Sequence, residues 1–319
     1  MTEYSQDHAA GPALVPGFSG GILPDALRSV TSRIASLVPK ADRMLHAHRL
    51  RLRMRAALGY DPDFRTPRTF NEKVAWRMLN DRNPLFPVTT DKIAVRDYVA
   101  AKVSTDILIP LFGTWDRAAD VPWDALPRRF VLKANHGWNM NILVADKDQT
   151  DRDGALRTAA EWLRYSHYTK TGEWGYRDIP PRLLAEEMLL DEQGSIPADL
   201  KFHVFNGKSK LLRIHTGRFH NFRTRYFDEN LQPLQFTKFC PIDPDYVLPP
   251  ETRDMARLAE RLAADFDFAR VDLYLVRGHV WFGEMTHYEG SACTPFFPPE
   301  YDRIIGDMWQ LPKGAPHLG

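Results

Sequence analysis

The sequence predicts an α+β protein, in which helical segments come first and antiparallel hairpins come last. Up to about residue 105, apolar side chains recur mainly at helical spacing. The last third contains two hairpin patterns, one around Asn206-Gly207 and one around Gly278. Asn-Gly is a strong hairpin signal because both residues tolerate positive φ. A length of 319 residues indicates roughly two domains, or one domain with two lobes.

The composition is that of an ordinary globular protein. It is 44% hydrophobic and 26% charged, and the net charge of +1 gives no reason to expect a nucleic-acid partner. Cys240 and Cys293 are too few for a disulfide framework or a zinc site. No apolar run has the length of a membrane span, and no signal peptide is recognisable, so a cytoplasmic protein is expected.

The first segments differ from the rest in composition. Residues 1–24 are rich in Gly, Pro, Ala and Ser, and we expect a disordered leader. Residues 27–58 read as a basic helix in which Asp42 is the sole acid. This helix has two interpretations, a solvated face that packs on its neighbour, or peripheral contact with an anionic membrane or glycan.

The following segments alternate between helix and strand. Thr69 and Glu72 have the spacing of a capping box, which predicts a helix beginning at Pro67. We then expect a helix after Thr90, strands at 107–112 and 130–133, a helix at 153–165, and an apolar run at 183–190. In the first hairpin, residues 203–205 pair with 211–214, which places Lys201 opposite Leu212. A helix with an apolar stripe follows Pro249-Pro250.

The last hairpin brings two acids together. If its turn is centred on Gly278, Asp272 lies opposite Glu284 and Tyr274 opposite Phe282, with Thr286 on the same face. Opposed like charges destabilise a sheet, and a bound divalent cation would offset the repulsion. Oxygen ligands suit magnesium. The alternative is a solvated face on which the two carboxylates splay apart.

Three lysines stand at positions that suit phosphate. Lys133 ends an apolar strand and is followed by a loop with His136 and Gly137, whose N–H groups could complement the ammonium. Lys92 precedes a helix, and Lys201 opens the first hairpin. Each can also be an ordinary surface lysine.

Common catalytic motifs are absent. The sequence contains no dinucleotide-binding glycine fingerprint, no P-loop, no zinc-protease helix motif and no serine nucleophile elbow. Asp-x-Asp triplets occur at 151–153, 243–245 and 265–267, a pattern that can chelate metal in sugar transfer but is common in turns.

An ordered set of stretches resembles the TupA-like ATP-grasp family over roughly residues 45–312. The stretches are Thr69 to Lys73, Asp81 to Pro84, Asp91-Lys92 with Arg96, Phe130 to Gly137, Ala185 to Glu187, Lys201-Phe202 with Asn206-Gly207, Arg270 to Tyr274, and Phe282 to Glu284 with Thr286. The resemblance implies two α+β lobes that clamp ATP. It places a helical region at 25–105, a first lobe at 106–184 and a second lobe at 185–319.

The resemblance also implies roles for individual residues. Lys92 and Lys133, with His136 and Gly137, would contact the phosphates of ATP, and Lys201 would be a further nucleotide contact. The adenine would lie beside Glu186, Glu187, Met188 and Leu189. Asp272 and Glu284, with Thr286 as a weaker ligand, would hold Mg²⁺.

The implied reaction is that of an ATP-dependent ligase. It would activate a carboxylate as an acyl phosphate and join it to an amine, such as an amino acid, in polysaccharide or glycan-peptide biosynthesis. Arg270, Arg218 and Lys201 are the predicted catalytic residues. The candidate carboxylate holders are Arg213, Arg218, Arg223, Arg225 and Arg270. The alternatives are a glycosyltransferase or kinase acting on a polysaccharide precursor, and a non-catalytic nucleotide-binding partner of a glycan assembly complex.

Overall fold

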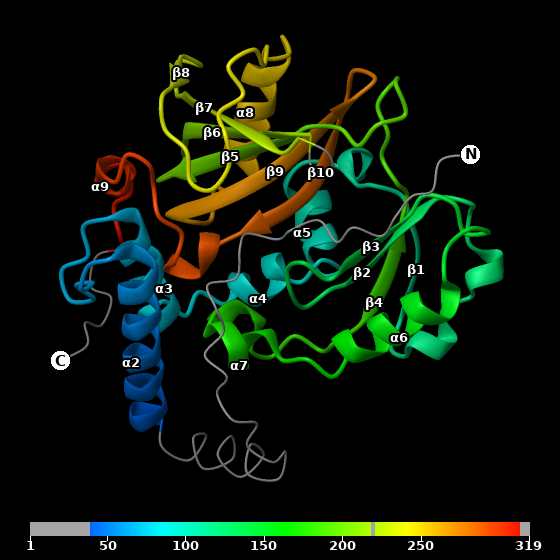
Figure 1. Ribbon diagram of the computed structural model, residues 1–319, viewed down its shortest axis with the longest axis horizontal. Coiled ribbons are helices and arrows are strands. Elements are labelled where there is room, and N and C mark those ends of the chain that lie inside the picture. The colour runs from blue at the N-terminus through cyan, green and yellow to red at the C-terminus, as the bar shows by residue number, and fades with distance from the viewer. Residues whose placement is uncertain (1–38, 218–220, 313–319) are drawn as a thin grey trace.

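The computed structural model describes residues 39–217 and 221–312, which form two antiparallel sheets with helices around them (Figure 1). The smaller sheet has four strands in the order β1-β4-β2-β3. The larger has six in the order β10-β9-β5-β6-β7-β8. The predicted α+β composition is confirmed.

In the described part of the chain, four helices precede the sheets. They are α2 (Pro39–Leu58), α3 (Phe70–Asn80), α4 (Leu85–Thr90) and α5 (Val95–Lys102). Both hydrogen bonds of the predicted capping box are present at Thr69, so the helix begins at Phe70 rather than at Pro67. The first part of the predicted basic helix and the predicted leader lie outside the described residues. Membrane contact through this helix stays a prediction.

The smaller sheet consists of β1 (Leu111–Trp115), β2 (Phe130–Ala134), β3 (Asn141–Val144) and β4 (Leu183–Glu186). Helix α6 (Arg152–Trp162) packs on it, so that Ala155 and Ala159 join one buried cluster with Phe130 and Leu132. The first strand begins later than predicted, because Thr105–Ile107 forms a 3₁₀ turn. Helix α7 (His167–Thr171) and the 3₁₀ helix η4 (Trp174–Tyr176) lead into β4.

The larger sheet consists of β5 (Asp199–Phe205), β6 (Lys208–Thr216), β7 (Arg223–Asp228), β8 (Pro233–Leu234), β9 (Phe268–Val276) and β10 (His279–Thr286). Helix α8 (Thr252–Leu262) packs against β5, β6 and β9. The Phe70 ring of α3 makes edge contacts with Phe205 and Phe268. Helix α3 also contacts α9 (Glu300–Asp307), which joins the helical region to the end of the described chain.

Two β-bulges change the predicted strand register. Asp272 lies opposite Glu284 as predicted, but Tyr274 pairs with Trp281 and not with Phe282. The cause is the turn, which has two residues, Arg277 and Gly278, so that Val276 pairs with His279. An extra residue, Gly283, then restores the pairing of Asp272 with Glu284, and a Cβ added to Gly283 would come within 2.8 Å of the Tyr274 ring.

The second bulge lies between His203 and Val204. It shifts the first hairpin by one residue, so Lys201 pairs with Arg213 and the predicted pairing with Leu212 is wrong.

Candidate active site

Neighbouring strands of the larger sheet place three charged residues in one row. Lys201 on β5 lies opposite Asp272 on β9, and Asp272 lies opposite Glu284 on β10. The Lys201 ammonium forms an ion pair with Asp272 Oδ2. Because the register of an antiparallel pair fixes which side chains are opposed, this row follows from the strand order.

Arg270 joins the two acids. Its Nε and Nη2 donate to the two oxygens of Asp272 at 2.6 and 2.8 Å, and Nη2 also donates to Glu284 Oε1 at 2.6 Å. The guanidinium therefore offsets the repulsion between the carboxylates. The predicted offset by a bound divalent cation stays a prediction, and Arg270, two residues before Asp272, reaches both acids without one.

These contacts decide the charge of Asp272. Burial alone would raise the pKa of this carboxyl, but the positive charges of Arg270 and Lys201 hold it well below its usual range. Burial would lower the pKa of Arg270, and the two acids raise it instead. Asp272 is therefore charged at neutral pH.

A second group of charges lies on the smaller sheet. The Lys133 ammonium on β2 pairs with Glu186 Oε1 on β4. Lys92, just before α5, donates from Nζ to the carbonyl of Gly137, and its backbone N–H donates to Asn135 at 3.2 Å. Lys92 is therefore fixed against the loop that follows β2.

Lys92 links the two groups. Burial lowers the pKa of its ammonium, Glu284 of the larger sheet acts in the opposite direction, and Lys133 of the smaller sheet lowers it further. An electrostatic influence of this kind requires proximity. Lysines and acids from both sheets thus converge on one region.

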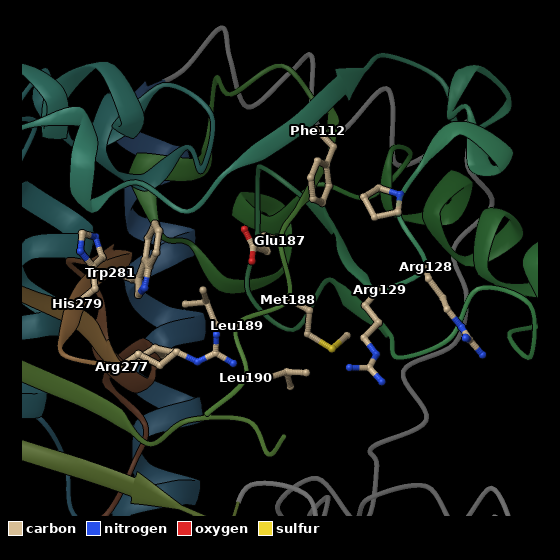
Figure 2. A pocket seen from close by; sticks show the side chains of 12 residues that line it. Phe112, Arg128, Arg129, Glu187, Met188, Leu189, Leu190, Arg277, His279 and Trp281 are labelled. Atoms are coloured by element: carbon tan, nitrogen blue, oxygen red, sulfur yellow. The ribbon is translucent and has the colours of Figure 1, made fainter. Parts of the chain in front are cut away.

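The segment predicted to contact adenine borders a cavity of about 740 Å³. Figure 2 shows Glu187, Met188 and Leu189 in the middle of this cavity, with Phe112 above them and Trp281 to one side. The N–H of Glu187 already donates to the carbonyl of Pro110 at 2.9 Å, and Glu186 is engaged by Lys133. Backbone contacts to a purine would therefore fall on Met188 and Leu189.

The remaining predicted residues differ in their relation to these charges. The His136 ring contacts the carbonyls of Trp162 and Tyr165 at 3.0 and 3.1 Å, and is directed at the end of α6 rather than at the lysines. Arg223 and Arg225 lie on β7, separated from β5 by β6. Arg218 lies outside the described residues. Thr286 donates to Glu284 Oε1 at 3.3 Å.

A family model described as TupA-like ATPgrasp matches residues 72–310. The chain belongs to the TupA-like ATP-grasp family. Its fold is accordingly the ATP-grasp fold, as the sequence predicts. A sequence comparison with curated proteins found no significant match.

Several solved ATP-grasp enzymes resemble the chain in structure. D-alanine–D-alanine ligase from Bacillus anthracis matches with a TM-score of 0.43 and 16% identity over 69% of this chain and 66% of the ligase. N5-carboxyaminoimidazole synthase from Aspergillus clavatus matches with 0.39 and 12%, over 68% and 50%. The ATP-grasp ligase PsnB gives 0.40 and 12%, over 70% and 58%. The chain thus covers less than two thirds of each of these proteins.

The TupA-like chain also contains a buried ionic cluster that the sequence did not predict. Glu289, in the turn after β10, accepts hydrogen bonds from Lys238 at 2.7 Å and Arg213 at 3.0 Å, and its other oxygen contacts His203. Arg213 is therefore engaged by an internal acid. No local pattern in the sequence links Glu289 to these three partners, which lie 51 to 86 residues away in the chain.

Magnesium suits the donor atoms of the acid pair. Protein sites for Mg²⁺ use one or two carboxylates and fill the remaining positions with water and substrate phosphates. Asp272 and Glu284 supply that number of carboxylates. No group of three or more His, Cys, Asp or Glu positioned to hold a metal is present in residues 39–217 and 221–312, so phosphate oxygens would have to complete such a site.

No described helix of this ATP-grasp protein is both long enough and apolar enough to span a membrane.

Proposed function

We propose that this protein is an ATP-dependent carboxylate–amine ligase. The observation that best supports the proposal is the position of Lys92, which is held by the loop after β2 and lies within electrostatic range of Glu284, Lys133 and Glu186. Charges from both sheets therefore meet where a polyphosphate would have to lie between them.

The cations have the chemistry of a phosphate site. Lys92, Lys133 and Lys201 provide ammonium groups, and Arg270 provides a guanidinium. Phosphoryl transfer needs positioned positive charge more than covalent catalysis, because negative charge is spread over the oxygens of the transferred group. We propose that these residues align the triphosphate, with Met188 and Leu189 against the adenine.

Asp272 and Glu284 would hold magnesium, with Thr286 beside them. When bound, the ion would neutralise phosphate charge. Arg270 would have to share the two carboxylates with it, since both are hydrogen-bonded to this guanidinium. Asp272 would bring its full negative charge to this site, because its pKa is held low.

The proposed reaction has two steps. A substrate carboxylate attacks the γ-phosphorus, which gives an acyl phosphate and ADP. An amine then attacks the acyl carbon, the C–O bond to phosphate breaks, and an amide forms. The substrates we propose are a uronic-acid glycan or a smaller carboxylate and an amino acid or related amine, as in polysaccharide or glycan-peptide synthesis.

The test is product analysis with the full chain, Mg²⁺-ATP and a panel of uronic acids and amino acids. A ligase gives ADP and phosphate only when both a carboxylate and an amine are present. ADP without phosphate indicates a kinase, and sugar transfer without ATP use indicates a glycosyltransferase; either result overturns the proposal. Asp272→Asn should reduce turnover at least 100-fold, whereas Asp254→Asn on the exposed surface of α8 should not change it.

A further inference from the structure

Glu173 is a buried carboxylate between α7 and η4. It is 2% exposed, and Ser291 Oγ donates to its Oε1 while the Trp138 side chain forms a further hydrogen bond with it. Trp138 follows the loop residue Gly137, and Ser291 lies in the turn after β10. Glu173 thus joins the two segments that flank the proposed ATP site.

The carboxylate has no cationic partner at ion-pair distance in the part of the chain that the structure describes. Its nearest basic contact is His167 Nε2, at 3.9 Å from Oε2, and the positive charge of Arg53 acts on it only from beyond ion-pair distance. Buried Asp and Glu side chains are nearly always paired with a cation or a metal, because desolvating an unpaired charge is unfavourable. A missing cation next to a polyphosphate site suggests that a substrate provides it.

His167 strengthens this argument. It is 3% exposed, and neither of its ring nitrogens has a hydrogen-bond partner among the residues that the structure describes. Its ring centroid lies 4.5 Å from that of Tyr176 and 5.0 Å from that of Trp138. Trp138 is 45% exposed and covers the buried pair. A carboxylate attracts an ammonium ion directly, and neighbouring aromatic rings attract it to their faces.

The turn after β10, which contains Ser291, has an unfavourable backbone conformation. Ser291 and Ala292 have φ values of 49° and 62°, in the left-handed region that residues with a Cβ rarely adopt. Such conformations persist where the surroundings enforce them, often at binding and catalytic sites. Here the conformation directs Ser291 Oγ at Glu173.

Glu173 lies close to the proposed ATP site. Gly137, directly before Trp138, accepts the hydrogen bond from Lys92, and Tyr176 is influenced electrostatically by both Glu173 and Glu284. An amine held at Glu173 would therefore lie next to the site where the acyl phosphate forms.

We propose that Glu173 and His167, covered by Trp138, bind the ammonium group of the amine co-substrate, and that Glu173 accepts a proton from it. This inference rests on the proposed ligase function. The protonated amine passes one proton to Glu173, and its freed lone pair attacks the acyl carbon. The C–N bond forms, the C–O bond to phosphate breaks, and phosphate leaves with that electron pair and with the second proton of the nitrogen.

The protonation of Glu173 fits this role. Burial raises the pKa of its carboxyl to about 7, although the bonds from Ser291 and Trp138 act in the opposite direction. Burial also lowers the pKa of His167 to about 3, so the imidazole is neutral. The other charged or titratable groups that face Glu173 are Arg53, Tyr176, Tyr288 and Cys293.

The experiment measures binding of ethylammonium chloride to the full chain by calorimetry at pH 5.5 and pH 8, with ethanol as a neutral ligand of similar size. Since only ionised Glu173 attracts the cation, affinity should rise roughly thirtyfold between these pH values. Glu173→Gln keeps the shape and should abolish both the affinity and its pH dependence. Glu173→Asp keeps the charge and should retain weaker, pH-dependent binding. Glu161→Gln, on the exposed side of α6, is the matched control.

Equal binding to wild type and Glu173→Gln, or no binding of ethylammonium to the wild type at either pH, overturns the inference. The result is independent of turnover. If Glu173-dependent binding is found but no carboxylate and amine pair gives ADP and phosphate, the ligase proposal fails and the cation site stands. If amine-dependent ADP release is identical in wild type and Glu173→Gln across pH 5.5 to 8, the ligase stands and this inference fails.

Discussion

Asp272 and Glu173 are both 2% exposed, yet their surroundings are opposite. Asp272 accepts two hydrogen bonds from Arg270 and pairs with Lys201. Glu173 accepts hydrogen bonds from the neutral side chains of Ser291 and Trp138. The pKa of Asp272 is held below its usual range by its cations, whereas burial raises the pKa of Glu173 to about 7. Burial alone therefore does not set the charge of a carboxylate; the charge of its partners does.

The difference separates two chemical tasks. A group that must hold a cation and phosphate at every physiological pH needs a permanent charge, which Arg270 and Lys201 secure for Asp272. A group that must take up a proton and release it again needs a pKa near the working pH. Glu173 meets the second requirement and Asp272 the first.

Removing Arg270 should have the largest effect on stability, because its guanidinium offsets the repulsion between Asp272 and Glu284. Arg270→Ala leaves Asp272 and Glu284 opposed without the guanidinium. We expect a loss of about 3–5 kcal/mol in the free energy of unfolding at pH 7, the range found when one partner of a buried ion pair is removed. Urea unfolding followed by circular dichroism measures it.

Arg257 on α8 provides the matched control for this change. It pairs with Asp254 at 2.9 Å, but both side chains are largely exposed. Arg257→Ala should change the unfolding free energy by less than about 1 kcal/mol. If Arg270→Ala is no more destabilising than Arg257→Ala, Arg270 does not offset the repulsion between Asp272 and Glu284.

Glu173→Gln should have the next largest effect, and its sign depends on pH. The pKa of the folded carboxyl, about 7, lies above its ordinary value of 4.5. The folded state therefore holds the proton more tightly, and wild-type stability falls as pH rises from 4.5 to 7. Glutamine cannot ionise, so between pH 5 and pH 8 the variant should gain about 3 kcal/mol relative to wild type.

Unfolding curves of both proteins at the two pH values test this. If the variant gains almost no stability relative to wild type between pH 5 and pH 8, Glu173 ionises in the folded state as easily as in the unfolded state. Burial would then not raise its pKa, and the contrast in pKa with Asp272 would be lost. Asp272 should behave in the opposite way, since its depressed pKa contributes stability that is lost as pH falls into the acid range.

The sequence predicted the first of these sites much better than the second. A turn centred on Gly278 predicts that Asp272 faces Glu284, and the two residues do pair. The observed turn has two residues, Arg277 and Gly278, and the bulge at Gly283 restores the predicted pair. The predicted pairing of Tyr274 was wrong because the turn has two residues and is not centred on Gly278. The predicted pairing of Lys201 was wrong because a bulge lies between it and its turn, and a bulge leaves little trace in a short sequence. The compensating role of Arg270 depends on side-chain reach, which strand register does not specify.

Nothing local in the sequence marks Glu173. Ser291, which donates to it, is 118 residues away in the chain, and Trp138 lies on another loop. Its pKa depends on burial by segments from four parts of the fold, and periodicity within one segment cannot predict such an environment. The family resemblance did not identify it either, because it was limited to stretches that match the ATP-binding pattern.

Ser291→Ala should have the smallest effect on stability. It tests the comparison of Glu173 with Asp272 by removing one neutral hydrogen-bond partner of Glu173. The Ser291 hydroxyl lowers the pKa of this carboxyl, so its removal should raise the pKa further and move the pH dependence of ethylammonium binding to higher pH. A hydrogen bond to a charged group contributes about 1.5–3 kcal/mol and a neutral one about 1 kcal/mol. The variant should therefore lose more stability at pH 8 than at pH 5, as measured by urea unfolding. Equal losses at both pH values would mean that the hydroxyl supports only the strained turn and not the charge of Glu173.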